Sequence, residues 1–70
     1  MAISYNKLWK LLIDKGMSKV ELRKSIDLAP NTLTKLNKNE EVAMTVLERI
    51  CKELHADFGD IVEYIDDQEE

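Results

Sequence analysis

One stretch of the chain, residues 17–36, limits the possible folds more than any other feature. It contains a strong helix start, because Ser18 is followed three residues later by Glu21, which is the spacing of a capping box. Farther along, Pro30 suits the first position of a second helix, since its fixed φ is already helical and its missing N–H is not needed there. The stretch therefore predicts two short helices joined by a tight turn.

The apolar residues of this stretch predict how the two helices pack. Their spacing points four side chains inward, namely Ile26, Leu28, Leu33 and Leu36. Two helices packed across a tight turn form a helix-turn-helix, in which the second helix can enter the major groove of DNA. We expect residues 30–37 to form that second helix.

The outer face of this second helix carries hydrogen-bond donors and no acid. At about 100° per residue, the arc opposite Leu33 and Leu36 holds Asn31, Thr34, Lys35 and Lys38. An asparagine can pair with adenine and a lysine with guanine at their major-groove edges. Exposed helix faces are often merely polar, but a face without acids in an acid-rich chain favours base recognition.

These residues resemble the lambda-repressor/Cro-like (Cro/CI-type, XRE) helix-turn-helix domains of bacterial and phage transcription regulators. The resemblance extends from Ser4 to about Ile65 and is strongest in residues 17–36 and 46–54. It implies a sequence-specific DNA-binding transcriptional regulator, which we expect to be a repressor, with helix 30–37 in the major groove of an operator. The candidate DNA-binding residues are Ser18, Lys19, Pro30, Asn31, Thr32, Thr34, Lys35 and Lys38.

The candidate residues divide by what they would contact. We expect Asn31, Thr34 and Lys35 to reach base edges. The phosphate contacts, of which the resemblance implies the first two, are Ser18, Lys19 and Lys38.

Two positions depart from the family's pattern. Asp27 stands where the turn usually has glycine, and aspartate tolerates a positive φ better than most residues. Arg23 stands where the family usually has a small residue. Either its long side chain extends outward to solvent, or the two helices cross less closely.

The rest of the pattern predicts an all-α domain of five helices with no sheet. The first helix, of about residues 5–15, has Ser4 as its cap and Gly16 as its left-handed end. The fourth starts at a second capping box, Thr45 with Glu48, and the fifth starts at the capping residue Asp57. Residues 19–26 and 30–37 are the second and third helices.

Charge is distributed unevenly along the 70 residues. The net charge of −4 is unusual for a nucleic-acid-binding domain. Residues 57–70 contain seven acids and no base, however, so residues 1–56 have ten bases, seven acids and a net charge of +3. We therefore divide the chain into a helix-turn-helix domain, 1–65, and an acidic disordered tail, 66–70, which we expect to limit non-specific DNA binding.

Composition excludes several other classes of function. No signal peptide and no apolar run of membrane length occur, so we expect a cytoplasmic protein without a membrane partner. Cys51 and His55 share a helix face, but a structural zinc site needs four ligands and Cys51 continues an apolar stripe. We expect no metal, cofactor, small-molecule ligand or catalytic activity.

A protein-interaction module of the same fold, antitoxin-like or regulator-binding and without affinity for DNA, is the alternative function. The acidic total charge and the apolar C-terminal segment favour it. The cationic, donor-rich outer face of helix 30–37 favours DNA instead, because a protein-binding helix would present apolar side chains there.

We expect the regulator to act as a homodimer, because one recognition helix reads few base pairs. The fifth predicted helix is more apolar than one small core is expected to absorb. The candidate dimer interface is Phe58, Ile61, Tyr64 and Ile65. The alternative is that Phe58, Ile61 and Val62 close the core of a monomer.

Overall fold

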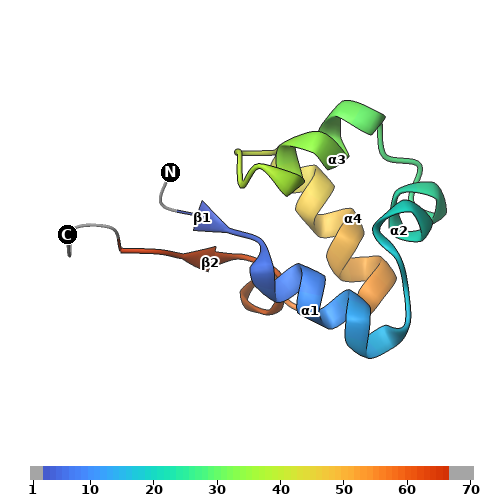
Figure 1. Cartoon of the computed structure of the whole chain (residues 1–70), viewed down its shortest axis with the longest axis horizontal. Helices are drawn as coiled ribbons and strands as arrows, with labels where there is room; N and C mark the ends of the chain where they lie inside the picture. Colours follow the sequence, from blue (N-terminus) through green and yellow to red (C-terminus); the bar gives the residue numbers. More distant parts are fainter. Residues whose placement is uncertain (1–2, 67–70) are drawn as a thin grey trace.

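The computed structural model describes residues 3–66, which form four α-helices and a short two-stranded sheet (Figure 1). In chain order the elements are β1 (Ile3–Ser4), α1 (Asn6–Lys15), α2 (Lys19–Ser25), α3 (Pro30–Asn37), α4 (Met44–Leu54), the 3₁₀ turn η1 (Phe58–Asp60) and β2 (Glu63–Tyr64). The helical helix-turn-helix architecture is confirmed, with α2 and α3 as the motif. The predictions of a fifth helix and of no sheet are wrong.

The helix boundaries around the motif follow the predicted signals. The N–H of Glu21 donates to Ser18 Oγ over 3.0 Å, and the N–H of Ser18 donates to Glu21 Oε1 over 2.7 Å, so the capping box forms. Gly16 ends α1 with a φ of 68°, and Pro30 occupies the first turn of α3. Local hydrogen bonding and backbone preference therefore decide where these helices begin and end.

Two predicted helix caps are displaced along the chain, by one residue at α1 and by two residues at α4. α1 begins at Asn6, whose N–H donates to Ser4 Oγ over 3.2 Å, so Ser4 binds the helix start from one position further back. α4 begins at Met44 and includes Thr45 in its first turn. Its cap position is held by Ala43, which has no side-chain acceptor, so the predicted capping box at Thr45 is wrong.

The C-terminal segment begins as predicted and then leaves the helical path. Asp57 and Asp60 form a capping box, but only the single turn η1 follows it. Beyond buried Ile61 the chain extends as β2, which pairs antiparallel with β1, placing Tyr64 opposite Ile3. The strand forms because β1 supplies backbone partners that no local pattern reveals, and the β-branched side chains before it favour an extended chain.

One apolar core lies between the helices. Its buried residues are Tyr5, Leu8, Leu12, Leu22, Leu28, Leu36, Leu47, Ile50, Leu54 and Ile61. Ile26 is half-buried against this core, and Leu33 is also half-buried. None of the helices between residues 3 and 66 is long and apolar enough to span a membrane.

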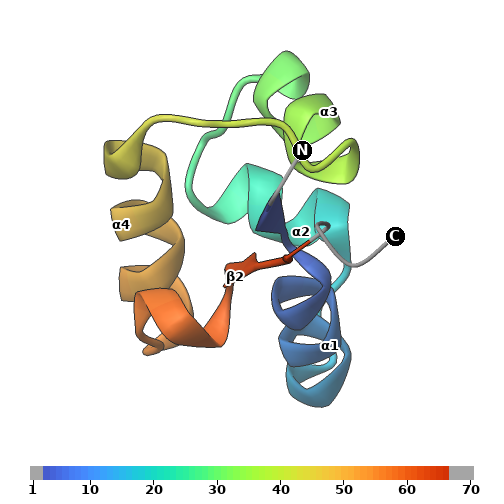
Figure 2. The same cartoon turned by 90° about the vertical axis from the view of Figure 1, so that its left-hand side faces the viewer.

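The helices are arranged so that α3 lies at an edge of the molecule. In Figures 1 and 2, α3 lies at the top and α1 at the bottom, with α2 and α4 at intermediate height. One side of α3 is therefore packed on the core, and the other is open to solvent. The acidic tail predicted for residues 66–70 lies outside the described residues, apart from Asp66.

Candidate nucleic-acid interface

The open side of α3 carries the side chains that the sequence assigns to it. Leu36 is fully buried and fixes the inner side of the helix. The exposed residues of α3 and its C-cap are Pro30, Asn31, Thr34, Lys35, Asn37 and Lys38. Thr32 is half-buried on the flank of the helix, so it does not belong to the outer face.

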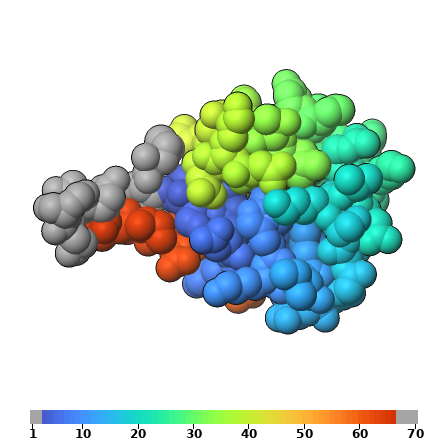
Figure 3. Space-filling view, viewed as in Figure 1, coloured from blue at the N-terminus to red at the C-terminus, as the bar shows by residue number. Residues whose placement is uncertain are grey.

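The predicted phosphate contacts of α2 lie beside α3. Lys19 Nζ donates to Asn37 Oδ1 over 2.8 Å, which brings the first turn of α2 next to the last turn of α3. Figure 3 shows the surfaces of α2 (cyan) and α3 (green) adjoining on one face of the molecule. The structure therefore brings Ser18 and Lys19 onto the same surface region as the end of α3.

Lys19 has a second partner that the sequence does not reveal. Its ammonium lies 4.1 Å from the ring centroid of Trp9, which belongs to α1. A cation over the face of an indole ring is attracted by the negative charge density of that face. Trp9 is half-buried against the core, and its ring also carries this contact.

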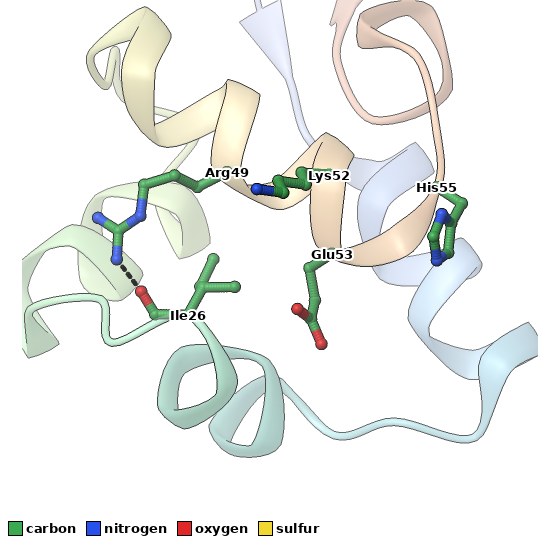
Figure 4. Close-up of a pocket in the computed structure, with 5 residues that line it drawn as sticks. All are labelled: Ile26, Arg49, Lys52, Glu53 and His55. Atoms are coloured by element: carbon green, nitrogen blue, oxygen red, sulfur yellow. Dashed lines mark hydrogen bonds between the residues drawn. The ribbon is translucent and has the colours of Figure 1, made fainter.

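The turn between α2 and α3 is held by two arginines. Arg49 of α4 donates to the carbonyl oxygens of Ile26 and Asp27, the second over 3.3 Å, and Figure 4 shows its side chain reaching Ile26. Arg23 donates to the carbonyl oxygen of Leu28 over 3.3 Å. Three consecutive carbonyl groups of the turn thus accept from a guanidinium.

This arrangement accounts for the two departures from the family's pattern. Asp27 takes the left-handed conformation, with a φ of 56°, that glycine usually provides. Arg23 is half-buried and turns its guanidinium to the turn rather than into the helix crossing. The contact of Arg49 was not predicted, because nothing in the sequence connects α4 with a turn more than twenty residues earlier.

The opposite end of α3 is held by Tyr5. Its N–H donates to Asn39 Oδ1 over 3.0 Å, and its hydroxyl donates to the carbonyl oxygen of Glu40 over 2.9 Å. Asn39 has a φ of 58°, so the chain turns sharply just after the helix. Burial raises the pKa of Tyr5 above 10.0, and the nearby charge of Glu41 raises it further.

Comparison with known proteins gives the family. The model of the Cro/C1-type HTH DNA-binding domain matches residues 7–67. The chain belongs to this family. It is also similar to the transcriptional regulator VanUg, whose crystal structure shares 55% sequence identity and a TM-score of 0.90, over 91% of this chain and 85% of that chain. A comparison with curated proteins finds no match.

A surface hollow of about 480 Å³ separates the turn of this Cro/C1-type domain from the end of α4. It is lined by Ile26, Arg49, Lys52, Glu53 and His55 (Figure 4). Arg49 lines this hollow and donates to the carbonyl oxygen of Ile26, so it connects α4 to the turn of the motif across the hollow.

Cys51 does not have the environment of a reactive thiol. It is half-buried, and burial raises the pKa of its thiol, with the charges of Asp57, Asp60 and Glu48 adding to the increase. The thiolate, which is the nucleophile and metal ligand, is therefore disfavoured. Among residues 3–66, no group of three or more potential metal ligands occurs.

The candidate dimer residues of this Cro/C1-type domain differ in exposure. Ile61 is fully buried and Phe58 is half-buried, so both contribute to the core of one chain. Tyr64 and Ile65 are 68% and 39% exposed. Of the four candidates, these two offer apolar surface to a second molecule.

Proposed function

We propose that this chain is a cytoplasmic, sequence-specific transcriptional regulator that acts as a repressor by inserting α3 into the major groove of an operator. The observation that carries the proposal is the exposed outer face of α3, where Asn31, Thr34, Lys35 and Lys38 present polar or cationic groups without an acid. A protein-interaction module would have apolar anchors on this face, and α3 has its leucines on the inner side instead.

Three side chains would read bases. Asn31 can donate to and accept from adenine, and Lys35 can donate to guanine. The hydroxyl of Thr34 already donates to the carbonyl oxygen of Pro30 over 3.2 Å, which leaves its methyl group for contact with a thymine methyl. Pro30, which is exposed, and Thr32, which is half-buried on the flank, lie in the first turn of α3 and complete the proposed set at the edge of its outer face.

The phosphate contacts would come from the start of α2 and from the C-cap of α3 beside it. Ser18 Oγ accepts the N–H of Glu21, but its hydroxyl hydrogen remains available as a donor. Lys19 and Lys38 are exposed cations. Such contacts position a protein on the duplex without reading sequence, and they make affinity dependent on salt.

Binding to random-sequence duplexes at two salt concentrations tests this proposal. We expect enrichment of one motif by the wild type. Lys35→Ala should cost about 1–3 kcal/mol on the enriched duplex and relax preference at one base position. Lys10→Ala, a change of an exposed lysine on α1, is the control. Equal losses on enriched and scrambled duplexes would show that α3 does not read bases.

We further propose that two copies bind the operator, with half-sites about one helical turn, 34–36 Å, apart. Tyr64 and Ile65 supply the apolar contact. Pairing brings acidic residues such as Glu63 and Asp66 of both copies together, so higher salt should strengthen it. Sedimentation of the wild type against Ile65→Asp tests this, and monomers in both, with and without DNA, would contradict it.

A further inference from the structure

The side chain of Lys19 is held from two sides by residues of neighbouring helices. Its ammonium lies 4.1 Å from the ring centroid of Trp9 on α1 and 2.8 Å from Asn37 Oδ1 at the end of α3. In Figure 3, the surfaces of α1 (blue), α2 (cyan) and α3 (green) meet on one face. This one cation therefore contacts both of the other helices that border the motif's surface.

Both partners leave the ammonium able to bind an anion. An ammonium has three N–H donors and no acceptor group. Asn37 Oδ1 takes one donor, and the ring of Trp9 attracts the charge from one side without using up the remaining donors. A phosphate oxygen can still accept from Lys19 while both of these contacts persist.

Ordering the side chain in advance also lowers the cost of binding. A free lysine loses much rotamer freedom when it is fixed on a phosphate, and this loss weakens binding. Lys19 is exposed, but its ammonium already contacts two partners. Binding of a phosphate by Lys19 therefore costs less side-chain conformational entropy than binding by a lysine that has no such partners.

We propose that Trp9 and Asn37 are positioning residues that hold Lys19 as a preset phosphate contact and thereby fix the distance between this phosphate and α3. The inference rests on the proposed function, because it assumes that this surface faces DNA. Asn37 is the last residue of α3, so its bond to Lys19 connects the phosphate contact directly to the helix proposed to read bases.

A double-mutant cycle tests this proposal. Trp9→Leu and Asn37→Ala are each made in the wild type and in Lys19→Ala, with Trp9→Phe as the variant that keeps an aromatic face. Affinity is measured for a scrambled duplex over a series of salt concentrations, and circular dichroism melting confirms that each variant is folded. Lys10→Ala on α1 is the charge-matched control.

We expect Lys19→Ala to reduce the slope of log affinity against log salt by about 0.9, the value for one lost phosphate contact. Trp9→Leu and Asn37→Ala should each weaken binding about two- to fivefold in the wild type. Neither should weaken it further in Lys19→Ala, because each acts through Lys19. Trp9→Phe should retain most of the affinity.

Two results would overturn the proposal. One is an unchanged salt slope in Lys19→Ala. The other is an equal loss from Trp9→Leu or Asn37→Ala in both backgrounds, which would mean that these residues only support the fold. If Trp9→Leu does not fold, Asn37→Ala, a change of an exposed side chain, decides the matter.

The proposed function can fail separately from this inference. The scrambled duplex measures phosphate contacts alone, so the absence of an enriched motif would refute base reading without affecting the cycle. A wild type that binds no duplex even at low salt would overturn both.

Discussion

The two ends of α3 are fixed by opposite kinds of interaction. At its start, the turn offers three carbonyl oxygens to the guanidinium groups of Arg23 and Arg49, in an exposed or half-exposed setting. At its end, the loop is held by Tyr5, which is 1% exposed and binds through neutral hydrogen bonds. Charge holds one end of the helix and burial holds the other.

This difference predicts different sensitivities. Hydrogen bonds from a charged donor are stronger than neutral ones, but exposure to solvent reduces their contribution. A buried neutral donor such as the Tyr5 hydroxyl responds to pH only when it ionises. The start of α3 should therefore respond to loss of charge on α4, and its end to alkaline pH.

Arg49→Ala should have the largest effect. It removes the guanidinium from the carbonyl groups of Ile26 and Asp27, and we expect a loss of about 1–2 kcal/mol in the free energy of unfolding, measured in urea. Arg49→Lys should recover only part of this, because an ammonium lacks the planar fork of donors. Lys52→Ala, on the same helix, is the control, and equal stability of Arg49→Ala and the control would contradict the role of Arg49.

Tyr5→Phe should have an intermediate effect. The change removes only the hydroxyl that donates to Glu40, at a cost of about 1 kcal/mol in the free energy of unfolding. Tyr64→Phe, at a residue that is 68% exposed, is the matched control and should change stability little. If both variants melt at the same temperature, the hydroxyl of Tyr5 does not stabilise this end of α3.

The difference in stability between the wild type and Tyr5→Phe should also depend on pH. The pKa of Tyr5 is raised in the folded state by burial and by Glu41, so the folded chain retains the phenolic proton to higher pH than the unfolded chain. This contribution to stability is fully present below pH 10 and is lost as the pH rises through the raised pKa. The stability advantage of the wild type over Tyr5→Phe should narrow above pH 10, and a constant difference would refute the shift.

The smallest effects are expected for substitutions of two residues with positive φ, Asp27 before α3 and Asn39 after it. Asp27→Gly should raise the free energy of unfolding by about 0.5 kcal/mol, because relief of the left-handed conformation is partly offset by greater freedom of the unfolded chain. Asn39→Gly should lower it by about as much, since it also removes the acceptor for the Tyr5 N–H. Urea denaturation of both variants checks the opposite signs.

Most of the fold could be predicted where its determinants are local. The capping box of Ser18, the proline at the start of α3 and Gly16 after α1 act within a few residues, and these boundaries are confirmed. The prediction of a fifth helix is wrong because the spacing of apolar residues after Asp57 also suits a turn followed by a strand. The choice between them depends on β1, at the other end of the chain.

The sequence predicted which residues of α3 are exposed, but it did not predict the contacts that hold α3 in place. The outer face of α3 follows from the helical period and the inward position of Leu36. The contacts that orient this face join residues distant in sequence, such as Arg49 with Ile26 and Lys19 with Asn37. Long, flexible side chains reach many partners, so neither composition nor periodicity selects one.

The pairing of β1 with β2 has a consequence for how the chain folds. It joins Ile3 to Tyr64, 61 residues later, and so closes nearly the whole chain into a loop. Loop-closure entropy makes such contacts slow to form, whereas α1 to α4 are built from short-range contacts. We therefore expect the helices to assemble first and the strands to join last, so that the backbone amides of β2 exchange with solvent before those of α4.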